Sequence, residues 1–109
     1  MEAKIDEMLY RLGANKAYIG FRYVVNCVKM IVEDEELQYY AKIPYTDTAA
    51  KYKTTAGCVE RDIRTIVNLI WEKGNRGLLN EVARRELKLR PKSKEFLAIM
   101  AEYMREVGE

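Results

Sequence analysis

The sequence predicts an all-α fold, a compact single domain of six or seven helices. Apolar residues recur at helical spacing along almost the whole chain, and no convincing alternation of apolar and polar residues indicates a strand. Glycine and proline contribute only 6 and 2 residues, too few for a loop-rich all-β chain. Because the length of 109 residues allows one domain of ordinary size, we expect residues 1–109 to fold as a single unit.

The N-terminal part of the chain contains three of the predicted helices. The first is predicted by apolar residues at positions i, i+3, i+4 and i+7, namely Ile5, Met8, Leu9 and Leu12. Gly13 should end it, and Asn15 is the expected cap of a second helix. The second helix should be buried at the centre of the fold, because its apolar residues are Tyr18, Phe21, Val24, Val25, Cys27, Val28, Ile31 and Val32. A short third helix should be capped by Asp34, end before Pro44 and carry Leu37, Tyr40 and Ala41.

Four more helices are predicted in the rest of the chain. They cover about residues 45–52, 55–73, 78–85 and 94–107. Thr54 or Thr55 should cap the long helix at its N-terminal end, and Gly74 and Asn75 should end it. The last helix should pack on the core through one face, which carries Phe96, Leu97, Met100, Met104 and Val107.

The helices predicted at residues 45–52 and 55–73 have the pattern of a helix-turn-helix motif. Ala49 is small, as two closely crossing helices require, and Tyr52 closes the first helix. Val59 and Ile63 follow at a spacing that packs the second helix against the first at a steep angle. We therefore expect a helix-turn-helix over about residues 45–73, with a recognition helix over about 55–73.

A helical wheel separates two sides of this recognition helix. The side expected to face the core carries Val59, Ile63, Ile66, Val67 and Ile70. The opposite side carries Gly57, Arg61, Arg64 and Asn68, with Glu60 at its edge. Arginine can donate two hydrogen bonds to guanine and glutamate can accept one from cytosine, which favours reading of the DNA major groove. Gly57 allows close backbone approach, and the free amides of the first turn can hold a phosphate. The alternative is a solvated face with a Glu60–Arg64 ion pair.

Positive charge is gathered in the middle of the chain, although the net charge is only +2. Residues 74–95 contain seven basic and three acidic residues, whereas residues 1–40 contain five and seven. The most basic stretch carries Arg84, Arg85, Lys88, Arg90, Lys92 and Lys94, and is a candidate second surface for the DNA backbone or a solvated loop. Four lysines are further candidate phosphate neighbours: Lys42, Lys51, Lys53 and Lys73.

The residue types argue against an enzyme and against a metal or cofactor site. Histidine is absent and Ser93 is the only serine, which removes the usual general base, zinc ligand and serine nucleophile. Cys27 and Cys58 are too few and too far apart for a disulfide framework or a metal knuckle. Without a membrane span or a secretory signal in the sequence, we expect a cytoplasmic protein with reduced thiols and no membrane or small-molecule partner.

The order of several motifs resembles a known family over roughly residues 3–107. The strongest match is Thr54-Thr55-Ala56 followed by Val59-Glu60-Arg61 and Ile63-Arg64. It is supported by Trp71 with Gly74-Asn75, by Pro91 with Glu95-Phe96, and by Leu12-Gly13 and Gly20-Phe21. The chain resembles the family of C-terminal DNA-binding effector domains of the master sporulation response regulator, stage zero sporulation protein A.

The resemblance implies a six-helix domain that binds a short box in double-stranded DNA and regulates transcription at sporulation promoters. A second copy in tandem on DNA and RNA polymerase are the further partners it suggests. The family's base contacts transfer to Glu60, Arg61 and Arg64, and its contacts beside the DNA backbone transfer to Thr54 and Thr55. Together with the residues argued above, the expected backbone contacts are therefore Lys51, Lys53, Thr54, Thr55, Gly57, Asn68, Arg90 and Lys92.

The chain departs from the family pattern at the start of the recognition helix. Gly57-Cys58 stands where the family usually has Ser-Arg, and Lys53 stands where the turn often has Asn. The receiver domain with its phosphoacceptor is absent from the sequence. A rival interpretation is therefore a protein–protein interaction module that kept the fold but lost DNA reading, for instance an antagonist of a full-length regulator.

Overall fold

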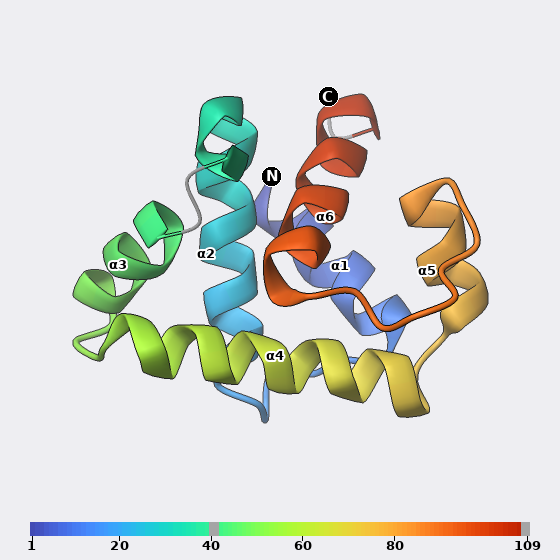
Figure 1. Ribbon diagram of the computed structural model, residues 1–109, viewed down its shortest axis with the longest axis horizontal. Coiled ribbons are helices and arrows are strands. Elements are labelled where there is room, and N and C mark those ends of the chain that lie inside the picture. Colours follow the sequence, from blue (N-terminus) through green and yellow to red (C-terminus); the bar gives the residue numbers. More distant parts are fainter. Residues whose placement is uncertain (40–41, 108–109) are drawn as a thin grey trace.

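A computed structural model describes residues 1–39 and 42–107, and it confirms the all-α fold. Within these residues there are six α-helices, one 3-10 helix and no strand. In chain order they are α1 (Glu2–Leu12), α2 (Gly20–Glu33), the 3-10 helix η1 (Glu35–Tyr39), α3 (Lys42–Lys51), α4 (Ala56–Lys73), α5 (Arg76–Ala83) and α6 (Ser93–Val107). In Figure 1, α4 lies along one edge of the molecule, and α2, α3 and α6 stand on the same side of it.

The core lies where α2 meets α4 and α6, so the prediction that the second helix is central is confirmed. Nearly every turn of α2 is buried, and Val24, Cys27 and Val28 are fully so. From the opposite side, α6 contributes the buried Phe96 and Met100. Gly13 ends α1 in the left-handed conformation, with φ of 115°, as the sequence predicts.

Two expectations about the N-terminal half are wrong. Asn15 does not cap α2, which begins five residues later at Gly20. Instead, the side-chain oxygen of Asn15 accepts a hydrogen bond from the Ala17 amide at 2.9 Å, which stabilises a local turn. Tyr18 therefore lies in this connection, 39% exposed, and not on the apolar face of the helix. Asp34 does cap the next segment, since its carboxylate accepts from the Glu36 amide at 3.2 Å.

Pro44 does not delay the start of the next helix. We expected a helix from residue 45, but α3 already begins at Lys42. Proline is tolerated in a first helical turn, because its missing amide hydrogen would have had no partner within the helix there. The predicted contribution of Tyr40 and Ala41 to the preceding helix lies outside the described residues.

The later helices agree better with their predicted bounds. Thr55 caps α4, which ends at Lys73 as predicted. The fifth helix begins two residues earlier than expected, because the side-chain oxygen of Asn75 caps it by accepting from the Leu78 amide at 3.0 Å. It also ends two residues earlier, at Ala83, where Arg84 adopts the left-handed conformation. The last helix starts at Ser93, one residue earlier than expected.

Close backbone contacts hold α4 in place from two sides. A Cβ atom on Gly20 would lie 2.1 Å from the carbonyl oxygen of Asp62, so only glycine allows α2 to approach α4 this closely. At the far end of α4, a Cβ atom on Gly74 would lie 2.2 Å from the carbonyl oxygen of Leu12. That same oxygen accepts a hydrogen bond from the Asn75 amide at 2.9 Å. The first helix of the chain therefore fixes the C-terminal end of α4.

A polar cluster joins α3 to α2. The side-chain Nδ2 of Asn26 donates to the hydroxyl of Thr48 at 2.8 Å, and the Cys27 thiol lies 3.3 Å from the same hydroxyl. Thr48 is completely buried, so these contacts satisfy a hydroxyl that has no access to water. Ala49 is buried beside it, in line with the small residue predicted at a close helix crossing.

Candidate nucleic-acid interface

The two helices α3 and α4 are joined by a four-residue turn and form a helix-turn-helix arrangement. Thr54 in this turn donates from its amide to the carbonyl of Ala49 at 2.9 Å. The hydroxyl of Thr55 accepts from the Cys58 amide at 3.1 Å and so caps α4. Lys53 adopts the left-handed conformation, with φ of 56°, which reverses the chain between the helices.

The two sides of α4 have the characters that the helical wheel predicts. All five apolar residues of its inner side are buried, from Val59 to Ile70. On the outer side, Gly57 is exposed, and the side chains of Arg61 and Arg64 are 61% and 50% exposed. Both guanidinium groups are therefore accessible to a partner over the first three turns of the helix.

Glu60 is held by two other side chains. Its Oε1 accepts a hydrogen bond from Nη1 of Arg64 at 3.2 Å, the ion pair that we considered as the alternative to base reading. Its Oε2 accepts one from the hydroxyl of Ser93 at 3.2 Å. Because each carboxylate oxygen accepts one of these bonds, Glu60 is held between α6 and Arg64 and is positioned to orient Arg64. No pattern in the sequence indicates this role for Ser93, which lies 33 residues away and looks like an ordinary residue at a helix start.

Arg61 is less constrained than Arg64. Its Nε lies 3.4 Å from Oδ1 of the adjacent Asp62, its single ion-pair contact among the described residues. Asp62 is mostly covered, because the N-terminal end of α2 packs against its backbone. Arg61 thus projects from a fixed stretch of helix.

The α5–α6 connection runs along one edge of α4 (Figure 1), where Arg90 donates a hydrogen bond to the side-chain oxygen of Asn68. Asn68, which the sequence suggested as a backbone contact, therefore also holds Arg90 beside the outer side of α4. Lys92 is exposed on the same connection, and Pro91 between them is buried.

The basic stretch of residues 84–94 is not uniformly available. Arg84 forms an ion pair with Glu106, and Arg85 forms one with Glu95 at 2.8 Å. Both arginines are thereby partly neutralised by carboxylates of α6. Lys88, Arg90, Lys92 and Lys94 are exposed and form no ion pair among the described residues, and Arg90 contacts α4 through Asn68.

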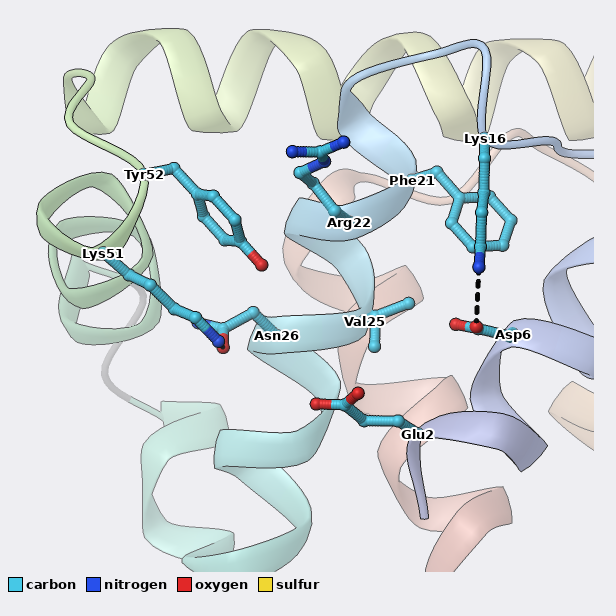
Figure 2. A pocket seen from close by; sticks show the side chains of 9 residues that line it. All are labelled: Glu2, Asp6, Lys16, Phe21, Arg22, Val25, Asn26, Lys51 and Tyr52. Carbon is cyan, nitrogen blue, oxygen red and sulfur yellow. Dashed lines mark hydrogen bonds and ion pairs between the residues drawn. The ribbon is translucent and has the colours of Figure 1, made fainter.

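A pocket of about 280 Å³ lies where the end of α3 meets α2. It lies between α1, α2 and the end of α3, as Figure 2 shows, and its lining includes Arg22, Lys51 and Tyr52. The ammonium of Lys51 donates to Oδ1 of Asn26 at 3.1 Å, so this predicted phosphate neighbour is anchored to α2. Lys53 is exposed in the adjacent turn.

The two thiols are free and differ in their environments. Burial raises the pKa of Cys27 to about 11, partly offset by its contact with Thr48. Hydrogen bonds from Thr55 and Thr54 lower the pKa of Cys58, and Arg61 contributes in the same direction. Cys58 is half-buried at the start of α4, next to the outer side of that helix.

Neither a metal site nor a membrane span is found in the described residues. No group of three or more His, Cys, Asp or Glu side chains there is arranged to hold a metal ion. Over residues 1–39 and 42–107, no helix has both the length and the apolar character needed to cross a bilayer.

The chain was compared with models of known protein families. The family model described as "Sporulation initiation factor Spo0A C terminal" matches residues 5–104. The matched range contains the whole helix-turn-helix, both edges of α4 and all but the last turn of α6.

Proposed function

The chain belongs to the family of sporulation initiation factor Spo0A C-terminal domains, DNA-binding regulatory domains and not enzymes, and we propose that it reads a specific DNA box. In this proposal α4 enters the major groove as the recognition helix of a transcription regulator. The observation that supports it best is the pair of exposed guanidinium groups, Arg61 and Arg64, on the side of α4 turned away from the core.

Three side chains would carry the sequence reading. Arg61 and Arg64 would each donate two hydrogen bonds to O6 and N7 of a guanine. Glu60 would act mainly by orienting Arg64, since its carboxylate already accepts from Arg64 and from Ser93. Fixing a long arginine in advance lowers the conformational entropy lost when it binds a base.

Other groups would bind the DNA backbone and set the register of α4. Thr54 and Thr55 lie at the N-terminal end of α4, where the free amides and the helix dipole attract a phosphate. Gly57 would let the backbone of the first turn approach closely, because nothing lies within 4 Å of its open side except the Thr55 hydroxyl. The remaining candidates for phosphate contacts are Lys51, Lys53, Asn68, Arg90 and Lys92.

The compartment, the partners and the output of the domain follow from the same proposed function. The residues 1–109 would act as one DNA-binding domain in the cytoplasm, with a second copy bound in tandem and RNA polymerase as a further partner. Its output would be regulation of transcription at sporulation promoters.

The test is a fluorescence-anisotropy titration with a duplex that carries two tandem family boxes and with a scrambled duplex, each at two salt concentrations. We expect the boxes to bind at least tenfold more tightly than the scrambled duplex at both salt concentrations. Arg61→Ala and Arg64→Ala should each weaken binding to the boxes by about 1–3 kcal/mol and relax discrimination at one base pair. Arg84→Ala is the matched control, because this exposed arginine pairs with Glu106 in the last turn of α6, at the end of that helix away from α4 (Figure 1).

Two outcomes would contradict the proposal. If both α4 variants kept the discrimination of the parent, the outer side of α4 would not be the reading surface. If no duplex bound in a salt-dependent way while a protein partner was captured, the chain would be the interaction module that is the alternative.

A further inference from the structure

Arg22 is an exposed cation near α4 that the function described so far does not use. Among the described residues it forms no ion pair, although Glu2 and Asp6 line the same pocket. Lys16 pairs with Asp6 at 3.3 Å, and Lys29, further along α2, pairs with Glu2 at 2.9 Å. Both carboxylates of the pocket are thus paired with other cations, and the charges of Arg22 and Lys51 have no carboxylate partner among the described residues.

An aromatic ring places Arg22 next to a second cation. The guanidinium carbon of Arg22 lies 5.8 Å from the centre of the Tyr52 ring, and the ammonium of Lys51 lies 5.4 Å from the same centre. Figure 2 shows these three side chains together, with Arg22 and Tyr52 at the end of the pocket toward α4, and Glu2 and Asp6 farther from that helix. A guanidinium, an ammonium and a phenol hydroxyl all donate hydrogen bonds, as binding of a phosphate requires.

The position of this group relative to α4 identifies which phosphate it would bind. Gly20, two residues before Arg22, touches the backbone of α4 at Asp62. On a wheel of 100° per residue, Asp62 and Glu60 lie roughly 160° apart, with the buried residues of α4 between them on one side and Arg61 and Arg64 on the other. Because Ser93, at the end of the α5–α6 connection, donates to Glu60, Arg22 and this connection lie along opposite edges of the exposed side of α4.

A helix with its side chains is about 10–12 Å across, and the major groove of B-DNA is about 12 Å wide. A helix in the groove therefore has one sugar-phosphate strand along each of its edges. We propose that Arg22, supported by Tyr52 and Lys51, binds a phosphate of the DNA strand on the α2 side of α4, opposite the strand reached by Arg90 and Lys92. This inference rests on the proposed function, which it extends to a second contacted strand.

A contact between Arg22 and a DNA phosphate has measurable effects on affinity and on its salt dependence. A phosphate contact adds affinity without sequence information, so it must strengthen boxed and scrambled duplexes alike. Each neutralised phosphate adds about 0.9 to the slope of log affinity against log salt concentration. The planar fork of arginine fits a phosphate in two hydrogen bonds, which a lysine at the same position cannot reproduce.

The experiment compares Arg22→Gln with Lys29→Gln over a series of salt concentrations. Lys29 is the matched control, because it lies two turns along the same face of α2, carries the same charge and is already paired with Glu2. We expect Arg22→Gln to weaken binding to both duplexes by the same factor and to lower the salt slope by about 0.9. Lys29→Gln should leave the slope unchanged, and Arg22→Lys should keep the slope but bind more weakly than the parent. Circular dichroism melting checks that all variants fold.

The source of the phosphate is tested on the parent protein by NMR, through the Nε–H signal of Arg22. This signal should move when the duplex is added and stay in place with millimolar inorganic phosphate. A shift with inorganic phosphate that the duplex does not produce would assign the pocket to a small anion and overturn the inference.

Two other results separate this inference from the function on which it rests. The first result is that the parent binds DNA, but Arg22→Gln keeps the parent's salt slope or loses no more DNA affinity than Lys29→Gln. In that case only the Arg22 contact is wrong. If the parent binds no duplex, both the DNA-reading function and the phosphate contact fail.

Discussion

Replacing Gly20 by alanine should destabilise the whole domain, although it adds one methyl group. The new Cβ atom would lie 2.1 Å from the carbonyl oxygen of Asp62 and 2.7 Å from its carbonyl carbon, whereas ordinary contacts begin at 3.4 Å. Both obstructing atoms belong to the backbone of α4 and cannot rotate away. The start of α2 must therefore move away from α4, which loosens the packing of Phe21 and Val24 in the core.

The expected loss follows from two opposing terms. Overpacking of a core typically costs about 1–3 kcal/mol and more where backbone must move, so we take the upper end here. Alanine is favoured over glycine within a helix by about 1 kcal/mol, which offsets part of this loss. We expect the free energy of unfolding in urea to fall by about 2 kcal/mol, and the melting temperature by roughly 10 °C.

Gly57→Ala is the matched control, because it makes the same change on an open helix position. A Cβ atom there would meet only the Thr55 hydroxyl at 4.0 Å, so the free energy of unfolding should rise by about 0.5 kcal/mol. If Gly20→Ala unfolds at the same urea concentration as the parent, α2 does not hold α4 in the way described.

Three further changes test other parts of the structure. Ser93→Ala should free one oxygen of Glu60 and lower the ratio of boxed to scrambled DNA affinity by less than tenfold, about 1 kcal/mol for one hydrogen bond. An unchanged anisotropy ratio would show that Ser93 does not position Glu60. Lys53→Asn should relieve the left-handed turn and raise the free energy of unfolding by up to about 1 kcal/mol, while weakening boxed and scrambled DNA equally. If Lys53→Asn changed the free energy of unfolding and the affinity for DNA in the same direction, this interpretation of Lys53 would be wrong. Burial raises the pKa of Cys27 from 9.0 to about 11, which means that the folded state favours the neutral thiol. The contribution of this thiol to the free energy of unfolding is therefore fully present below pH 9 and is lost as the pH rises through 11. Urea unfolding at the two ends of this range should show the parent losing about 2–3 kcal/mol more than Cys27→Ala. If the parent and Cys27→Ala lost the same free energy of unfolding, ionisation of Cys27 would not contribute to the loss of stability at high pH.

The features that the sequence predicted well are those with a periodic signal. Five apolar residues on one side of α4 fixed its orientation, and the capping threonine fixed its start. The errors arose where local signals compete. Asn15 has the chemistry of a helix cap, but its side chain closes a turn instead, and Pro44 disfavours a preceding helical residue yet fits a first turn.

Contacts between distant side chains explain why the site could be predicted only in part. The bonds from Ser93 to Glu60 and from Arg90 to Asn68 join residues 33 and 22 positions apart. No periodicity records such pairs, because they depend on the path of the α5–α6 connection. Arg22 gave no signal either, since a single arginine on an apolar helix looks like a solvated residue until its place beside α4 is known.

The way α4 is held has a consequence for how the family can diversify. The close contacts on α4 are made by main-chain atoms at Asp62 and Gly74 against the glycine and carbonyl groups of other helices. Exchanging side chains on the outer side of α4 leaves those atoms unchanged, and surface substitutions of this kind usually alter stability by less than about 0.5 kcal/mol. In the proposed function, new DNA preferences would therefore evolve, or be selected from a library at Gly57, Arg61 and Arg64, without compensating changes elsewhere in the scaffold.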